Sequence, residues 1–252
     1  MSSKRRRRPA RRVKPEPRRP AETVEITKIA QQGDGEGALT DATRIFVPLT
    51  LPGDVIRAQP GARRGDGIAG SVLEWIEQTP RKDPICNVYG SCGGCQLQHV
   101  PAADYESWKS DAVRTALARH GLSVELSPLR QVPLNARRRA TLSLVMTADG
   151  PVLGFNGAYS DRVIGMDGCP LLAPALADLW VPIRDFCASV FAAPLRADIR
   201  MTAAQPGSVE IVIATDRELD LGLREAIAAF SETHDIARFW WQLTGSPPDP
   251  VV

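Results

Sequence analysis

Residues 86–99 read Cys-Asn-Val-Tyr-Gly-Ser-Cys-Gly-Gly-Cys-Gln-Leu-Gln-His, and they hold three of the five cysteines in this 252-residue chain. The spacing Cys86-x5-Cys92-x2-Cys95 places three thiols within ten residues. Gly93 and Gly94 separate the last two cysteines, and glycines allow other groups to approach the backbone closely. Thiolates are soft ligands that suit zinc and iron–sulfur clusters. The stretch therefore predicts a metal centre around which the rest of the chain is arranged.

A metal centre of this kind needs a fourth ligand, and the sequence offers two further cysteines. Cys169 follows the turn-forming pair Asp167-Gly168 and precedes Pro170, which is typical of an exposed turn. Cys187 instead lies in an apolar helical stretch, where a free thiol behaves as a small core residue. We therefore predict metal ligation by Cys86, Cys92, Cys95 and Cys169.

The spacing favours an iron–sulfur cluster over zinc but leaves zinc open. Zinc knuckles usually present two close pairs of ligands, whereas Cys169 stands alone here. A redox pair formed by Cys92 and Cys95 is a third possibility, although the βαβ context of such motifs is missing. For His99 we favour a polar capping role in the loop over ligation.

Charge is distributed unevenly along the chain, whose net charge is only +2. Residues 1–20 carry ten Lys or Arg residues and one acid, and the remainder carries 21 basic and 28 acidic residues. With four prolines and few apolar residues, the 1–20 tail cannot bury a core, and we expect it to be disordered. Such a tail can contact RNA phosphates without sequence preference, or it can serve solubility alone.

The rest of the composition indicates a cytoplasmic protein without a membrane partner. No apolar run reaches the length of a membrane span, and the N-terminus lacks the apolar core of a signal peptide. Cytoplasmic thiols stay reduced, so clustered cysteines indicate metal ligands before disulfides. We expect a monomer.

The pattern of apolar residues predicts an α+β fold. Residues 21–79 contain short alternating segments between Gly, Pro and Asp turns, which indicates a small OB-like β-barrel. The glycine-rich run 33–37 leads into a strand, so a phosphate-binding loop is not favoured. Residues 80–121 comprise the cysteine loop and an amphipathic helix, 102–120, whose Tyr105 and Trp108 we expect to face a core.

Residues 122–252 predict a mixed α and β domain. We expect strands at 139–147, 151–155, 198–203, 208–214 and 236–243, with the third and fourth joined as a hairpin through residues 205–207. We expect helices at 171–191, with a break near Pro182, and at 219–230. No regular element is expected after Gly245. Arg137, Arg138 and Arg139 precede the first strand and are candidate contacts for RNA phosphates.

The motif Cys86-x5-Cys92-Gly-Gly-Cys95-Gln-Leu-Gln-His99 resembles the cluster motif of the 23S rRNA (uracil-5-)-methyltransferase family, which is related to the tRNA uracil-5-methyltransferases. Residues 33–37, 45–48 and 51–55 resemble the TRAM domain, a small RNA-binding β-barrel. Residues 137–143, 153–155, Ser160 and Cys169-Pro170 resemble the central domain of that family in order and rough spacing. The resemblance extends over about residues 23 to 252.

This resemblance implies that Cys86, Cys92, Cys95 and Cys169 bind a [4Fe–4S] cluster and that the partner is rRNA, with tRNA as the alternative. Members of the family methylate uracil C5 with S-adenosylmethionine, after a cysteine adds to C6. We find neither the glycine-rich cofactor motif nor that nucleophile, so we assign no catalytic residue and expect the S-adenosylmethionine-binding domain to be missing.

Two other classes of function remain. The chain could be a non-catalytic RNA-binding module with a structural iron–sulfur or zinc centre. A redox or radical enzyme is disfavoured, because radical enzymes that use S-adenosylmethionine need a C-x3-C-x2-C triad and the first gap here is five.

Overall fold

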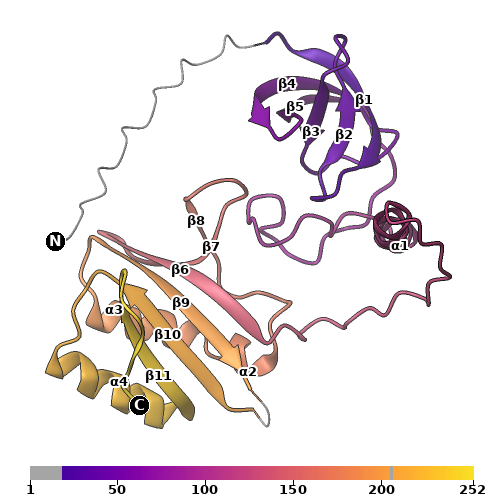
Figure 1. The fold of residues 1–252 in the computed structure, drawn as a ribbon. Helices are drawn as coiled ribbons and strands as arrows, with labels where there is room; N and C mark the ends of the chain where they lie inside the picture. Colours follow the sequence, from indigo (N-terminus) through magenta and orange to yellow (C-terminus); the bar gives the residue numbers. More distant parts are fainter. Residues whose placement is uncertain (1–18, 205–206) are drawn as a thin grey trace, which may run out of the picture. The chain divides into compact units, whose positions relative to one another are not determined.

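The computed structural model describes residues 19–204 and 207–252, in two compact units, Met1–Pro80 and Arg81–Val252 (Figure 1). The predicted disorder of the basic tail therefore lies outside the described residues, apart from Arg19 and Pro20. Each unit has its own hydrophobic core, and each is described by itself. No helix in the described ranges is both long and apolar enough to cross a membrane.

The first unit is a closed five-stranded barrel, as the sequence predicts. Its strands are β1 (Glu22–Ile29), β2 (Gly35–Ala38), β3 (Arg44–Val47), β4 (Val55–Arg64) and β5 (Gly67–Glu77). They close in the order β1-β2-β3-β5-β4, with β3 parallel to β5 and the other pairs antiparallel. Alternate side chains, including Val24, Ile26, Ile45, Val47 and Ile56, fill the interior.

The glycine-rich run belongs to the barrel wall. Gly37 lies in β2, and a Cβ atom there would come within 2.5 Å of the Glu25 carbonyl oxygen on β1. The glycine is required because the two strands pack closely, and the expectation that the run leads into a strand is confirmed.

The second unit is built on a seven-stranded sheet. Its strands are β6 (Arg139–Thr147), β7 (Gly150–Asn156), β8 (Val163–Gly165), β9 (Leu195–Ala203), β10 (Val209–Thr215), β11 (Ile236–Leu243) and β12 (Asp249–Pro250). Their order is β12-β11-β10-β9-β6-β7-β8, in which only the β10–β11 pair is parallel. The expected β9–β10 hairpin is confirmed, although positions 205 and 206 of its turn lie outside the described residues.

Helices cover one face of this sheet (Figure 1). They are α2 (Pro174–Ala177), α3 (Trp180–Val190) and α4 (Leu221–Thr233). Their buried side chains, among them Leu176, Ile183 and Ile227, share one core with the inward residues of the strands. Three predictions about the second unit need correction. One of them concerns the helix α1 (Ala102–Ala118), which precedes the sheet in the chain.

The break expected near Pro182 is present, and the first correction concerns its exact position. The break lies at Asp178 and Leu179, and Pro182 occupies the first turn of α3, where its missing N–H leaves no hydrogen bond unmade. The second concerns the end of the chain, where Asp249–Pro250 forms a short strand beside β11.

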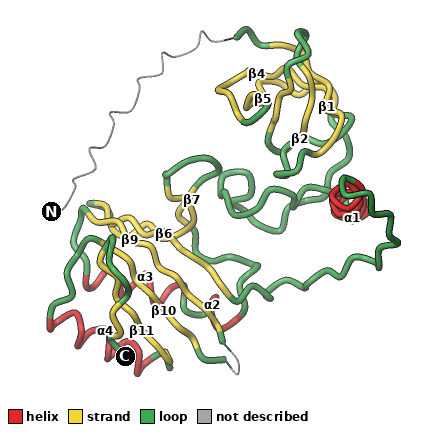
Figure 2. The backbone as a smooth tube through the Cα atoms, in the orientation of Figure 1, coloured by secondary structure: helices red, strands yellow, loops and turns green. Residues whose placement is uncertain are grey.

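The third correction concerns α1, whose aromatic stripe was expected to be core. No residue of this helix is buried, and Tyr105 and Trp108 are only half-buried, with Lys109 placed over both rings. Long segments without regular secondary structure flank the helix on both sides (Figure 2).

Candidate metal centre

The cysteine-rich loop docks on the end of β7 through backbone hydrogen bonds. The amide of Gly93 donates to the carbonyl of Asn156 at 2.9 Å, and the amide of Ala158 donates to the carbonyl of Ser91 at 3.3 Å. These bonds place Cys92 directly opposite Gly157 as an isolated antiparallel bridge. The loop thus extends the sheet by a single β-like step, which sets the position of the buried Cys92.

Tyr89 holds the loop together from inside. Its hydroxyl donates to the carbonyl of Gln96 at 2.6 Å and lies 2.5 Å from Nδ1 of His99. With the hydroxyl proton committed to Gln96, the His99 ring N–H is the donor in that second bond. Burial raises the pKa of Tyr89 to about 12, so the Tyr89 hydroxyl keeps its proton at neutral pH.

Cys169 reaches the same region from a distant part of the sequence. A tight turn carries it, with the amide of Leu172 donating to the Cys169 carbonyl at 3.1 Å. The strand-like segment that follows pairs with Arg137, whose amide donates to the carbonyl of Leu171 at 2.9 Å. Met166, just before the turn, donates from its amide to the Leu153 carbonyl on β7.

The four predicted ligands line one cavity, and Cys187 does not. Besides Cys86, Cys92, Cys95 and Cys169, the lining consists of Tyr89, Gly94, Gln98, Arg137, Phe155, Met166, Pro170 and Leu171. The walls are therefore largely apolar, and the sulfurs come from both the loop and the Cys169 turn. The prediction that Cys187 is a core thiol is confirmed, because it is fully buried in α3.

The thiols of this cavity share an electrostatic environment. Burial raises the pKa values of Cys92 and Cys169, and the neighbouring cysteines raise them further. Backbone N–H groups oppose this effect on both pKa values, from Gly94 to Cys92 at 3.4 Å and from Leu171 to Cys169. The Arg137 guanidinium also lowers the pKa of Cys169. Donors and a cation thus face the positions where thiolate charge would develop.

Convergence on one cavity is not the same as a formed metal site. Within residues 19–204 and 207–252, no set of three or more His, Cys, Asp or Glu side chains has the geometry to hold a metal ion. His99 does not line the cavity, which agrees with a loop-stabilising role. Metal ligation by the four cysteines therefore stays a prediction.

The three arginines proposed as RNA contacts occupy three different settings. Arg137 lines the cysteine cavity. The carbonyl of Arg138 accepts a hydrogen bond from the amide of Ala203, and Arg139 is the first residue of β6. All three are exposed.

Sequence reasoning missed two aromatic residues in the cavity, Tyr89 and Phe155. Tyr89 lies inside the cysteine motif itself, which could have drawn attention to it. Phe155 carries no local signal, because only the sheet brings the end of β7 to the loop.

Comparison with known proteins identifies relatives for most of the chain. No protein-family model matches it. An uncharacterised RNA methyltransferase of Caulobacter vibrioides is 40% identical over 154 residues, which are 60% of this chain and 36% of the relative. A 23S rRNA (uracil(1939)-C(5))-methyltransferase of Halomonas elongata is 34% identical over 77% of this chain and 41% of that protein.

A solved structure shares the fold. It is the Pyrococcus abyssi tRNA (uracil-54, C5)-methyltransferase in complex with S-adenosyl-L-homocysteine. The match covers 90% of this chain and 52% of the Pyrococcus chain, with a TM-score of 0.57 and 21% sequence identity. The chain spans half or less of the length of the curated relatives named above.

The expectation that the S-adenosylmethionine-binding domain is missing gains no support from these matches and stays a prediction. What they do establish is common ancestry. The chain is homologous to RNA methyltransferases, among them 23S rRNA (uracil-C5)-methyltransferases.

Proposed function

We propose that this chain is the RNA-binding and iron–sulfur portion of an S-adenosylmethionine-dependent RNA (uracil-C5)-methyltransferase that acts on 23S rRNA. The observation that carries the proposal is the gathering of Cys86, Cys92, Cys95 and Cys169, and not Cys187, around one cavity. The names of the relatives supply the reaction and the substrate class, with tRNA as the alternative RNA.

The residues present suit a [4Fe–4S] cluster. Four thiolates are the usual ligand set of such a cluster, and hydrogen bonds to the sulfurs are among the features that tune it. Gly94 and Leu171 already direct amide N–H groups at two of these sulfurs. A cluster held by these cysteines would link the loop to the Cys169 turn, and we assign it a structural role because the methyl transfer is redox-neutral.

The barrel is proposed to be a TRAM domain that contacts RNA, and the basic tail adds contacts to phosphates. Such contacts carry no sequence information but raise affinity in a salt-dependent way. We assign the binding of S-adenosylmethionine and the nucleophilic cysteine to a part of the enzyme other than the one that this chain matches in its relatives. The cytoplasmic location and the monomeric state belong to the same proposal.

The first prediction concerns the fourth ligand. Anaerobically purified protein should contain about four iron and four sulfide per chain, as a [4Fe–4S] cluster requires. Cys169→Ser should lose most of this iron and sulfide, because it removes one thiolate from the cavity. Cys187→Ala is the matched control and should retain both, because Cys187 is buried in α3 and lines no part of the cavity.

Iron and sulfide analysis with the absorption spectrum decides the outcome. Equal loss from both variants would refute Cys169 as the fourth ligand. A colourless protein with one zinc and no sulfide would replace the iron–sulfur proposal with a zinc-stabilised RNA-binding module.

A further inference from the structure

In residues 81–204 and 207–252, the helices of the second unit cover one face of its sheet. Along β9, Ala197, Ile199, Met201 and Ala203 are buried in the core, and the alternate residues point to the other side. The same alternation holds in β10, where every second residue is buried. The face opposite the helices, which we call the open face, therefore consists of the outward residues of β6, β9, β10 and β11.

All charged residues of these four strands lie on the open face. They are Arg139, Arg196, Asp198, Arg200, Glu210 and Arg238. Four are arginines and two are acids, so this face carries a net positive charge although residues 21–252 as a whole are acidic. Both acids are engaged within the face: Asp198 accepts the Ser143 hydroxyl at 3.2 Å, and Glu210 lies 3.8 Å from Arg238.

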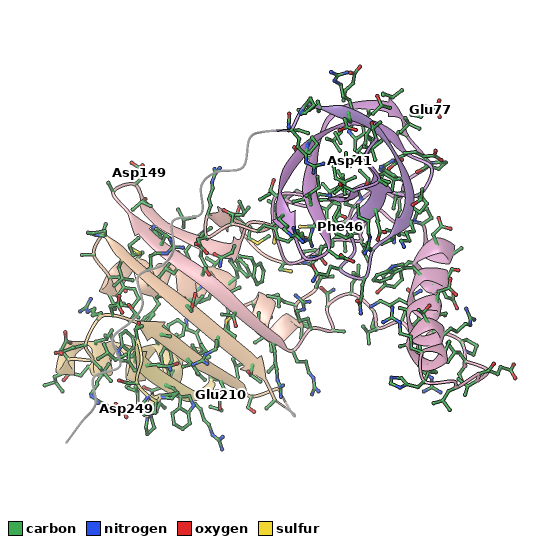
Figure 3. All side chains as sticks on the ribbon, turned by 45° about the horizontal axis from the view of Figure 1, so that its top comes forward. Asp41, Phe46, Glu77, Asp149, Glu210 and Asp249 are labelled. Atoms are coloured by element: carbon green, nitrogen blue, oxygen red, sulfur yellow. The ribbon has the colours of Figure 1, made fainter. Side chains whose placement is uncertain are left out.

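One row across the sheet combines a cation with an aromatic ring. The register aligns Arg200 on β9 with Val212 on β10, and Val212 with Trp240 on β11. Two strand spacings separate Arg200 from Trp240, or ~10 Å at the backbone. Arg200 also hydrogen-bonds Gln242 of β11, which turns its guanidinium toward the Trp240 strand. In Figure 3, the label Glu210 marks β10 near this row, and the label Asp149 marks the turn between β6 and β7.

The two adjacent tryptophans of β11 have different roles. Trp241 is buried in the core, and its indole N–H donates to the Arg217 carbonyl at 3.0 Å. Trp240 points to the opposite face and is only partly buried. A partly exposed indole beside arginines is the combination on which single-stranded nucleic acids stack their bases and neutralise their phosphates.

We propose that the open face binds a single-stranded segment of RNA, with a base stacked on Trp240 and a phosphate on Arg200. The inference rests on the proposed RNA-binding function and locates one of its surfaces. A duplex would satisfy Arg200 but not Trp240, because the faces of paired bases are stacked on each other and closed to the indole.

The test measures binding of the full chain to a short fluorescent uridine-containing single strand by anisotropy. Trp240→Ala should weaken binding by about 5- to 150-fold, the effect of losing one stacked base. Trp240→Phe should recover much of the affinity, because it retains an aromatic face. Arg200→Ala should reduce the slope of log affinity against log salt by about 0.7, which corresponds to one lost phosphate contact.

Arg224→Ala is the matched control, because Arg224 is exposed on α4 across the sheet from the open face and should not affect binding. Thermal unfolding of each variant verifies that it is folded. If the wild type does not bind RNA, the proposed function itself fails.

If the wild type binds while Trp240→Ala and Arg200→Ala bind equally tightly, only the open-face inference is overturned. Equal competition by duplex RNA would contradict base stacking. A change in self-association in place of RNA affinity would make this face a protein interface and would also overturn it.

Discussion

Gly93 is the residue at which the cysteine loop meets β7. A Cβ atom there would lie 3.0 Å from the Asn156 oxygen and 3.1 Å from the Ala158 nitrogen. Both atoms are backbone and cannot move aside without breaking the bonds that dock the loop. Gly94, its neighbour, differs because its Cβ would meet the Cys92 sulfur at 3.5 Å, an ordinary contact.

These two glycines give a matched pair of substitutions. Gly93→Ala should displace the loop from Asn156 and Ala158, reduce iron content and cost about 1–3 kcal/mol of unfolding free energy, as overpacking does. Gly94→Ala keeps the amide that donates to Cys92 and should change stability by less than about 0.5 kcal/mol. Iron analysis of Gly93→Ala and urea unfolding of both variants measure these effects, and an equal loss of stability in the two variants would contradict the close docking at Gly93.

At the scale of elements, α3 positions part of the cavity wall through Trp180. This side chain is fully buried, donates its indole N–H to the Met166 carbonyl at 2.8 Å, and lies 6.0 Å from the Phe155 ring between centroids. Met166 and Phe155 both line the cysteine cavity. The helix therefore positions two walls of the cavity without contributing a ligand.

Trp180→Ala should cost about 3–5 kcal/mol in unfolding free energy, because it leaves a large hole in the core. Trp180→Phe should cost about 1–3 kcal/mol, since it leaves the partly buried Met166 carbonyl without its donor. Val181→Ala, at a position 43% exposed on the same helix, should change stability by less than about 0.5 kcal/mol. Urea unfolding of the three variants checks this order, and a larger loss from Val181→Ala than from Trp180→Phe would refute it.

At the scale of the whole molecule, the chain separates into two units with independent cores, and all five cysteines belong to the second. The barrel is closed by its own strands, so its sheet has no open edge. The proposed metal centre and the barrel should therefore be separable.

Expressed as separate chains, residues 81–252 should retain the iron content of the intact protein, and residues 1–80 should fold without iron. Circular dichroism and iron analysis of the two fragments test this expectation. Failure of residues 81–252 to take up iron that the intact chain binds would show that the barrel contributes to the centre.

The sequence predicts most elements because their signals are local. Alternation along residues such as Val24 and Ile26 marks barrel strands, and the apolar surroundings of Cys187 mark a core thiol. Local signals fail where the environment decides. Pro182 is compatible with both a helix break and a first helical turn, and the aromatic pair of α1 is compatible with both a buried and an exposed stripe.

The sequence by itself determined the choice of candidate metal ligands, since three thiols within ten residues and Cys169 before a proline depend on residue type and spacing alone. Only the tertiary structure decided that Cys169 joins the loop, because backbone pairing of β7 with both the loop and Met166 brings distant segments to one cavity. It likewise decided that Arg200 and Trp240 share one row, because strand register across β9, β10 and β11 has no local signature.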